Sequence, residues 1–136
     1  MENTVAISWL AVIVAAIIKF AIGAVWYQLL FGKRYRELMK VPEGTMADGF
    51  AQALVVGFIG DLIMAYILAR FVAHYGATTL AEGALIGCMA WLGFVATLMA
   101  GSVFYEKKSI ELVAINAGYQ LVGIVVMGAI FGVWHS

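Results

Sequence analysis

Four long apolar runs constrain this chain more than any other feature of its sequence. They cover residues 5–31, 50–71, 83–104 and 110–134. A helix needs about 20 residues to cross the roughly 30 Å of hydrocarbon in a bilayer, and a backbone in lipid must satisfy its own hydrogen bonds. The runs therefore predict an all-α fold, a four-transmembrane-helix bundle of two antiparallel hairpins, formed by one domain over residues 1–136.

The composition agrees with a lipid environment. The chain is 65% hydrophobic and 12% charged, whereas soluble domains are about 45–50% apolar and about 25% charged. The bilayer is therefore the expected partner of most of the surface. The formal net charge is zero, which argues against binding to nucleic acid.

The sequence offers little for redox or metal chemistry. Cys88 is the single cysteine, so a disulfide framework and a CxxC pair are excluded, and we expect it to be a small buried hydrophobe. We expect His74 in a loop, and His135 lies at the C-terminus. Neither histidine has a second ligand at metal spacing, so we expect no metal site and no cofactor.

The connections carry capping and charge signals. The segments 45–48 (TMAD) and 79–82 (TLAE) fit the capping pattern that opens a helix, and Ser109 is placed to cap the fourth helix. The basic segment 32–41 is read either as a helix lying on the headgroups or as a solvated loop.

Basic residues give the expected orientation. Six of the eight Lys and Arg lie in the first and third connections, which fall on the same side of the bundle. Positive residues stay cytoplasmic, so both termini are expected outside. The residues concerned are Lys33, Arg34, Arg36, Lys40, Lys107 and Lys108.

Two ionisable residues lie deep inside the apolar runs. Lys19 is twelve residues before position 31, and Asp61 is eleven residues after position 50, so both are about 16–18 Å from the same face. A charge at such depth costs roughly 2.5–3.5 kcal/mol on insertion scales. We therefore expect Lys19 and Asp61 to meet, as an ion pair or as a neutral hydrogen-bonded pair.

The fourth run adds hydrogen-bonding groups at this level. Asn116, Tyr119 and Gln120 share one face of a helix, and the third run contributes Trp91, Phe94 and Thr97. These residues predict a polar intramembrane layer of Lys19, Asp61, Asn116, Tyr119 and Gln120. Such a layer either ties the helices together or forms a functional site.

Two further patterns concern packing and catalysis. Glycines at positions 83 and 87, and at 128 and 132, fit the close-packing pattern of membrane helices, either within one chain or in a homo-oligomer. Residues 57–61 (GFIGD) approach an intramembrane aspartyl protease motif, but the second membrane Asp that this chemistry needs is missing. We therefore expect no enzymatic activity.

Several segments resemble a bacterial membrane family, the domain of unknown function 1761. They are residues 23–27 (GAVWY), 92–97 (LGFVAT), 115–121 (INAGYQL) and 127–130 (MGAI). The resemblance covers nearly the whole chain and implies the same four-helix fold in a bacterial inner membrane. It supplies no activity. It directs attention to Gly23, Trp26, Tyr27, Asn116, Tyr119 and Gln120.

Two hypotheses about function follow. In the first, the protein binds or passes a small solute or a proton through the polar layer, with Lys19 and Asp61 as the charged pair. Four short helices leave little room for a pathway, so this hypothesis expects a homo-oligomer. In the second, the chain is a non-catalytic accessory or scaffold subunit of a larger membrane complex, and the layer only fixes helix register.

Overall fold

The computed structural model describes residues 7–39, 50–107 and 109–134. It confirms the all-α fold, since no strand occurs in these ranges. Four helical spans of 22 to 26 residues are long and apolar enough to cross a membrane. The elements in chain order are α1 (Trp9–Val25), η1 (Trp26–Leu30), α2 (Gly32–Met39), α3 (Phe50–His74), α4 (Leu80–Ala90), η2 (Trp91–Ala96), α5 (Thr97–Tyr105) and α6 (Ile110–Val133). The predicted cap at residues 45–48 lies outside the described residues.

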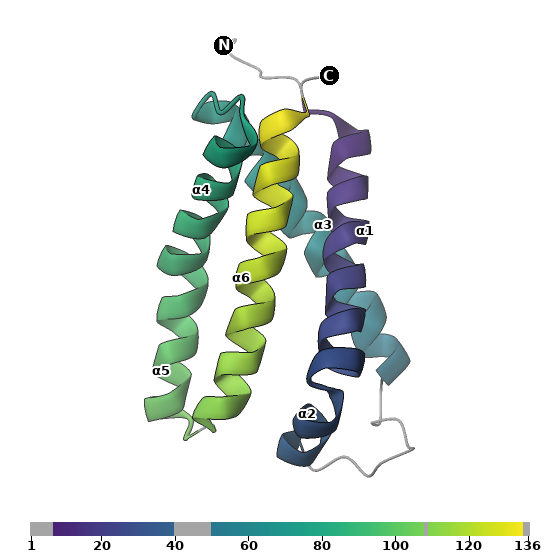
Figure 1. Cartoon of the computed structure of the whole chain (residues 1–136), viewed down its shortest axis with the longest axis vertical. Helices are drawn as coiled ribbons and strands as arrows, with labels where there is room; N and C mark the ends of the chain where they lie inside the picture. Colours follow the sequence, from purple (N-terminus) through teal and green to yellow (C-terminus); the bar gives the residue numbers. More distant parts are fainter. Residues whose placement is uncertain (1–6, 40–49, 108, 135–136) are drawn as a thin grey trace.

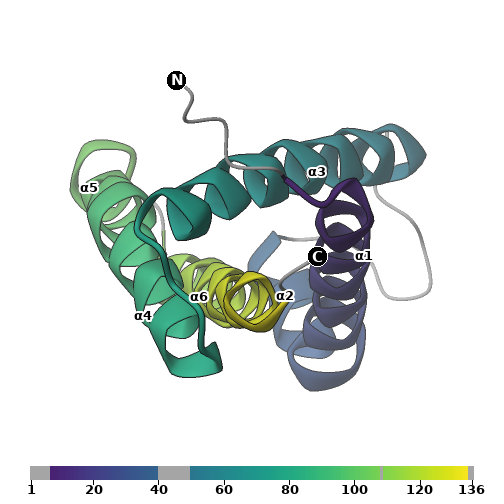
Figure 2. The ribbon, with the colours of Figure 1, turned by 90° about the horizontal axis from the view of Figure 1, so that it is seen from above.

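The helices are arranged around α6 (Figures 1 and 2). This helix runs between α4 on one side and α1 on the other, and α3 crosses behind them at a steep tilt. The beginning of α1 and the end of α6 lie at one end of the bundle, called here the terminal end. The opposite end carries α2 and the connection from α5 to α6, and is called the α2 end.

The closest helix contact is between α4 and α6, and glycine makes it close. A Cβ atom on Gly83 would collide with the carbonyl oxygen of Gly128, and one on Gly87 would lie 2.6 Å from the carbonyl oxygen of Ile124. With no side chain in the way, the two backbones approach directly and gain van der Waals contact, which drives helix association in lipid. The two glycine patterns thus pack against each other within one chain.

The terminal half of the bundle holds the apolar core. It is formed where α1, α3 and α6 meet, and small side chains bring α1 and α3 together. The buried members are Ala11, Val12, Ala15, Ala16, Ala65, Leu68, Ala69, Val72, Ile124, Met127 and Phe131.

At the α2 end, α3 leaves the bundle. Residues 51–57, 59 and 60 are exposed, and the first buried residue of α3 is Asp61. A Cβ atom on Gly57 or Gly60 would meet nothing within 4 Å. One aromatic contact remains, in which the rings of Phe20 and Phe58 meet edge to face with centroids 5.5 Å apart. Asp61 therefore marks the point where α3 departs from α1 and α6.

Helix ends follow the capping chemistry. The capping box at α4 is confirmed, since the Thr79 hydroxyl accepts from the Glu82 amide at 3.1 Å and the Glu82 carboxylate accepts from the Thr79 amide at 3.2 Å. Ser109 accepts from the Leu112 amide at 3.4 Å. The segment 32–41 contains a helix, α2, rather than a loop.

Two sequence expectations were wrong. His74 is the last residue of α3 and does not lie in a loop, because the turn that ends the helix comes only at Gly76, whose φ of +70° is the left-handed conformation that glycine adopts at helix ends. Cys88 is exposed rather than buried. Its neighbour Gly87 faces α6, so the cysteine one position later points away from the bundle.

Candidate functional site

Three helices bring one charged network together in the interior. Lys19 of α1 donates from Nζ to Asp61 Oδ1 of α3 at 2.8 Å and to the Tyr119 hydroxyl of α6 at 3.1 Å. The exposed fractions of these residues are 1%, 7% and 8%. The Tyr119 hydroxyl in turn donates to the Lys19 carbonyl oxygen at 3.2 Å. Lys19 Nζ also lies 4.3 Å from the centre of the Tyr119 ring, a cation–π contact.

Two glycines make room for this network. A Cβ atom on Gly123 would lie 2.9 Å from Cγ of Lys19, so α6 accepts the aliphatic stem of the lysine only because position 123 has no side chain. A Cβ atom on Gly23 would lie 3.0 Å from the Tyr119 hydroxyl oxygen. Gly23 is one of the residues to which the family resemblance points, and its role here is to admit the phenol.

The carboxylate of Asp61 is only partly satisfied. Oδ1 accepts from Lys19, and Oδ2 accepts no hydrogen bond from any residue that the structure describes. Asp61 also stands where α3 leaves the bundle. One carboxylate oxygen is therefore free to accept a proton or a hydrogen bond from a solute.

The other predicted members of the layer have different surroundings. Asn116 lies one turn from Tyr119 toward the α2 end and accepts a hydrogen bond from the Tyr27 hydroxyl at 2.6 Å. Oε1 of Gln120 is buried, with no hydrogen-bond partner among the described residues. Of the residues expected from the third run, Phe94 is 65% exposed, and the Thr97 hydroxyl donates to the Gly93 carbonyl of its own helix.

Two tryptophans fasten neighbouring spans to α6, a feature that the sequence did not reveal. Trp26 opens the π-helical segment η1 and donates from Nε1 to the Ile115 carbonyl oxygen at 3.0 Å. Trp91 opens the π-helical segment η2 and donates to the Ala117 carbonyl oxygen at 2.9 Å. Single π-helical turns inside α-helices are frequent at functional sites, and here each π-helical segment begins at an indole that docks on α6.

Aromatic and charged contacts continue from the network to the α2 end. The Tyr27 ring lies 5.4 Å from the Tyr119 ring and 4.7 Å from the Tyr35 ring, measured between centroids. In α2, the Arg34 guanidinium donates to both carboxylate oxygens of Glu111 at 2.6 Å. The nearby carboxylates raise the pKa of Arg34 further above its already high value. This bidentate pair ties α2 to the first turn of α6.

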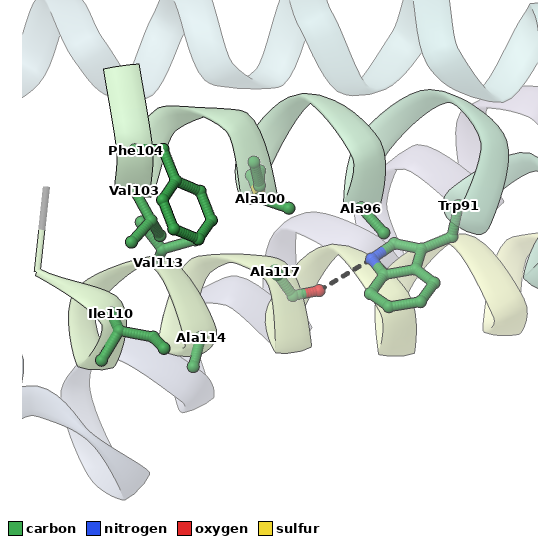
Figure 3. A pocket seen from close by; sticks show the side chains of 10 residues that line it. Trp91, Ala96, Ala100, Val103, Phe104, Ile110, Val113, Ala114 and Ala117 are labelled. Atoms are coloured by element: carbon green, nitrogen blue, oxygen red, sulfur yellow. Dashed lines mark hydrogen bonds between the residues drawn. The ribbon is translucent and has the colours of Figure 1, made fainter. Parts of the chain in front are cut away.

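An apolar groove lies apart from the charged network (Figure 3). It measures about 280 Å³ and runs between α5 and α6, with Trp91 at one end and Phe104 near the other. Its lining includes Ala96, Ala100, Val103, Ala114 and Ala117. Within the part of the chain that the structure describes, no three His, Cys, Asp or Glu side chains are grouped so as to hold a metal ion.

The fold and the site define a four-span helical membrane protein with an ion pair buried between three of its spans. The chain matches the family model described as a protein of unknown function (DUF1761) over residues 10–132, and it belongs to that family. The matched range contains every residue of the charged network. No curated protein and no solved structure matches the chain.

Proposed function

We propose that this protein binds a proton or a small solute at the Lys19–Asp61–Tyr119 network and passes it within the membrane. One observation carries the proposal: a charged pair is buried among the spans while one carboxylate oxygen of Asp61 has no hydrogen-bond partner among the described residues. Ionisable residues in membrane spans mark ion pathways and proton relays. A purely structural tie needs no charges, since neutral polar contacts already hold membrane helices together with about 0.6 kcal/mol each on average.

The geometry suggests an exchange at Asp61. A proton, or a solute that donates a hydrogen bond, binds to the free Oδ2 and weakens the attraction between Asp61 and Lys19. Lys19 then keeps two contacts with Tyr119, to the hydroxyl at 3.1 Å and to the ring face. Loss of the proton or solute restores the ion pair. Asn116 and Gln120 are the additional hydrogen-bonding groups on α6.

We also propose the membrane in which the protein resides and its orientation there. We place the protein in a bacterial inner membrane with the α2 end in the cytoplasm, because Lys33, Arg34 and Lys107 lie at that end and positive residues stay cytoplasmic. The role is non-enzymatic and requires no cofactor. A homo-oligomer is expected, because the exposed part of α3 is available for contacts that a single chain does not make.

Proton flux into proteoliposomes tests the proposal. A potassium diffusion potential drives proton entry, and a trapped dye reports the internal pH. The native protein is expected to speed acidification, and Asp61→Asn is expected to abolish the gain. Glu37→Gln, the same carboxylate-to-amide change at an exposed position in α2, serves as the matched control. Equal flux from folded native protein and folded Asp61→Asn would remove Asp61 from any proton pathway.

A second candidate function, that of an accessory subunit, is favoured by the apolar surfaces. The groove between α5 and α6 is lined by apolar residues and contains about 280 Å³, and residues 51–57 of α3 are exposed. Native mass spectrometry of protein released from nanodiscs separates the two functions. A defined oligomer carrying a small molecule supports binding, whereas release only together with another membrane protein supports the accessory function.

A further inference from the structure

We propose that the Lys19–Asp61 pair is reached from the α2 end of the bundle and is closed toward the terminal end. This inference rests on the proposed function for its significance. The ion pair divides the bundle into a half toward the terminal end and a half toward the α2 end. These two halves differ in packing and in polarity.

The terminal half is closely packed and apolar, and this region is called here the seal. From Lys19 to Ala11, α1 contributes buried small and branched apolar residues over about 12 Å. From Asp61 to Val72, α3 does the same over about 16 Å. Ala15, Ala16, Ala65 and Met127 are fully buried at this junction. A polar species crossing this region would lose its hydration with no group to replace it, which is costly.

The half toward the α2 end is open by comparison. There α3 no longer covers α1 and α6, since residues 51–57, 59 and 60 are exposed and open space surrounds Gly57 and Gly60. Asp61 lies at the inner limit of this opening, as the first buried residue of α3. Asp61, one of whose carboxylate oxygens accepts no hydrogen bond from the described residues, therefore lies where the sealed half ends and the open half begins.

Polar groups line this half. From the pair toward α2, the side chains between α1 and α6 include the Tyr119 hydroxyl, the Tyr27 hydroxyl and the Asn116 amide. Tyr27 and Asn116 are half-buried, unlike the fully buried core on the other side. These hydroxyl and amide groups can hydrogen-bond water or a small solute on its way to Asp61. The pair is thus the inner end of a one-sided site.

Cysteine accessibility tests the sidedness directly. In a Cys88→Ala background, Asn116→Cys places a thiol on the open side and Ala69→Cys places one in the seal. A charged, membrane-impermeant methanethiosulfonate reagent is added to either face of sealed vesicles of known orientation. Lys33→Cys and Tyr75→Cys mark the two faces, because Lys33 is exposed in α2 and Tyr75 is exposed just after α3.

The expected result is modification of Asn116→Cys only from the face that labels Lys33→Cys, and no modification of Ala69→Cys from either face. Labelling of Ala69→Cys from the face of Tyr75→Cys, or no labelling of Asn116→Cys from the α2 face, overturns the proposal. If Asn116→Cys does not fold, Tyr27→Cys replaces it, since Tyr27 is also half-buried on the open side. One-sided labelling without proton flux would refute the proposed function and leave the sidedness standing.

Discussion

Replacing both members of the buried ion pair is expected to destabilise the protein far less than replacing one. Lys19 is 1% exposed and its Nζ lies 2.8 Å from Asp61 Oδ1. Removing one partner of a buried pair leaves an uncompensated charge and costs about 3–5 kcal/mol. Lys19→Met keeps the length of the stem against Gly123, so we expect it to lower the free energy of unfolding by about 3 kcal/mol through charge alone.

The double variant Lys19→Met/Asp61→Asn contains no unpaired charge. We expect its free energy of unfolding to lie within about 1 kcal/mol of the native value, which, with losses of about 3 kcal/mol for each single variant, gives a coupling energy of about 5 kcal/mol in the double-mutant cycle. Unfolding in mixed micelles with rising mole fraction of dodecyl sulfate, followed by circular dichroism, measures all four proteins. Lys33→Met, at an exposed position, is the control and is expected to change stability by less than about 0.5 kcal/mol. If the effects of the two single variants add in the double variant, the two residues do not form a pair.

Three further outcomes follow from the contacts. Gly123→Ala places a Cβ atom 2.9 Å from Lys19 Cγ and should lower the thermal midpoint in detergent. The control is Gly93→Ala, whose Cβ atom would meet nothing within 4 Å. It should leave the thermal midpoint unchanged or raise it, because alanine favours helices by about 0.5–1 kcal/mol over glycine. Arg34→Gln removes the bidentate contact with Glu111 and should speed amide hydrogen exchange in α2, as should high salt acting on the native protein. Trp26→Phe removes the donor to α6 and should lower the free energy of unfolding by about 0.5–1.5 kcal/mol in the dodecyl sulfate titration.

The fold was predictable from the sequence because hydropathy and length leave one solution in lipid. The meeting of Lys19 and Asp61 was predictable as well, since equal depth on sequential antiparallel helices and the cost of isolated charges restrict the partners. Helical periodicity selected Tyr119 correctly. It could not separate Tyr119 from Gln120, because adjacent residues point about 100° apart and only the neighbouring helices decide which one reaches the lysine.

The π-helical segment η2 explains why the sequence did not predict which residues of the third span face α6. A regular α-helix places Phe94 on the side of Trp91, but η2 inserts extra residues into the turn. The residues that follow Trp91 along the groove are Ala96 and Ala100, at spacings of five and four. Phe94 is turned to the outside as a result. Nothing in the hydropathy pattern marks this insertion, because the residues on all faces of the span are apolar.

The family-like segment 115–121 is best understood as the place where other helices dock. Its backbone carbonyls accept hydrogen bonds from the indoles of Trp26 and Trp91. The Asn116 side chain accepts one from the Tyr27 hydroxyl, and the Tyr119 hydroxyl accepts one from Lys19. The glycine at 118 would, with a Cβ atom, lie 3.1 Å from the Trp26 ring. Five consecutive residues of α6 thus receive side chains from two other spans. Only one of these contacts involves a charge, so the docking of the first and third spans on α6 is expected to persist when the ion pair is removed. The stability of the double variant and the loss of proton flux on Asp61→Asn therefore measure separate properties, helix docking and the chemistry of the pair.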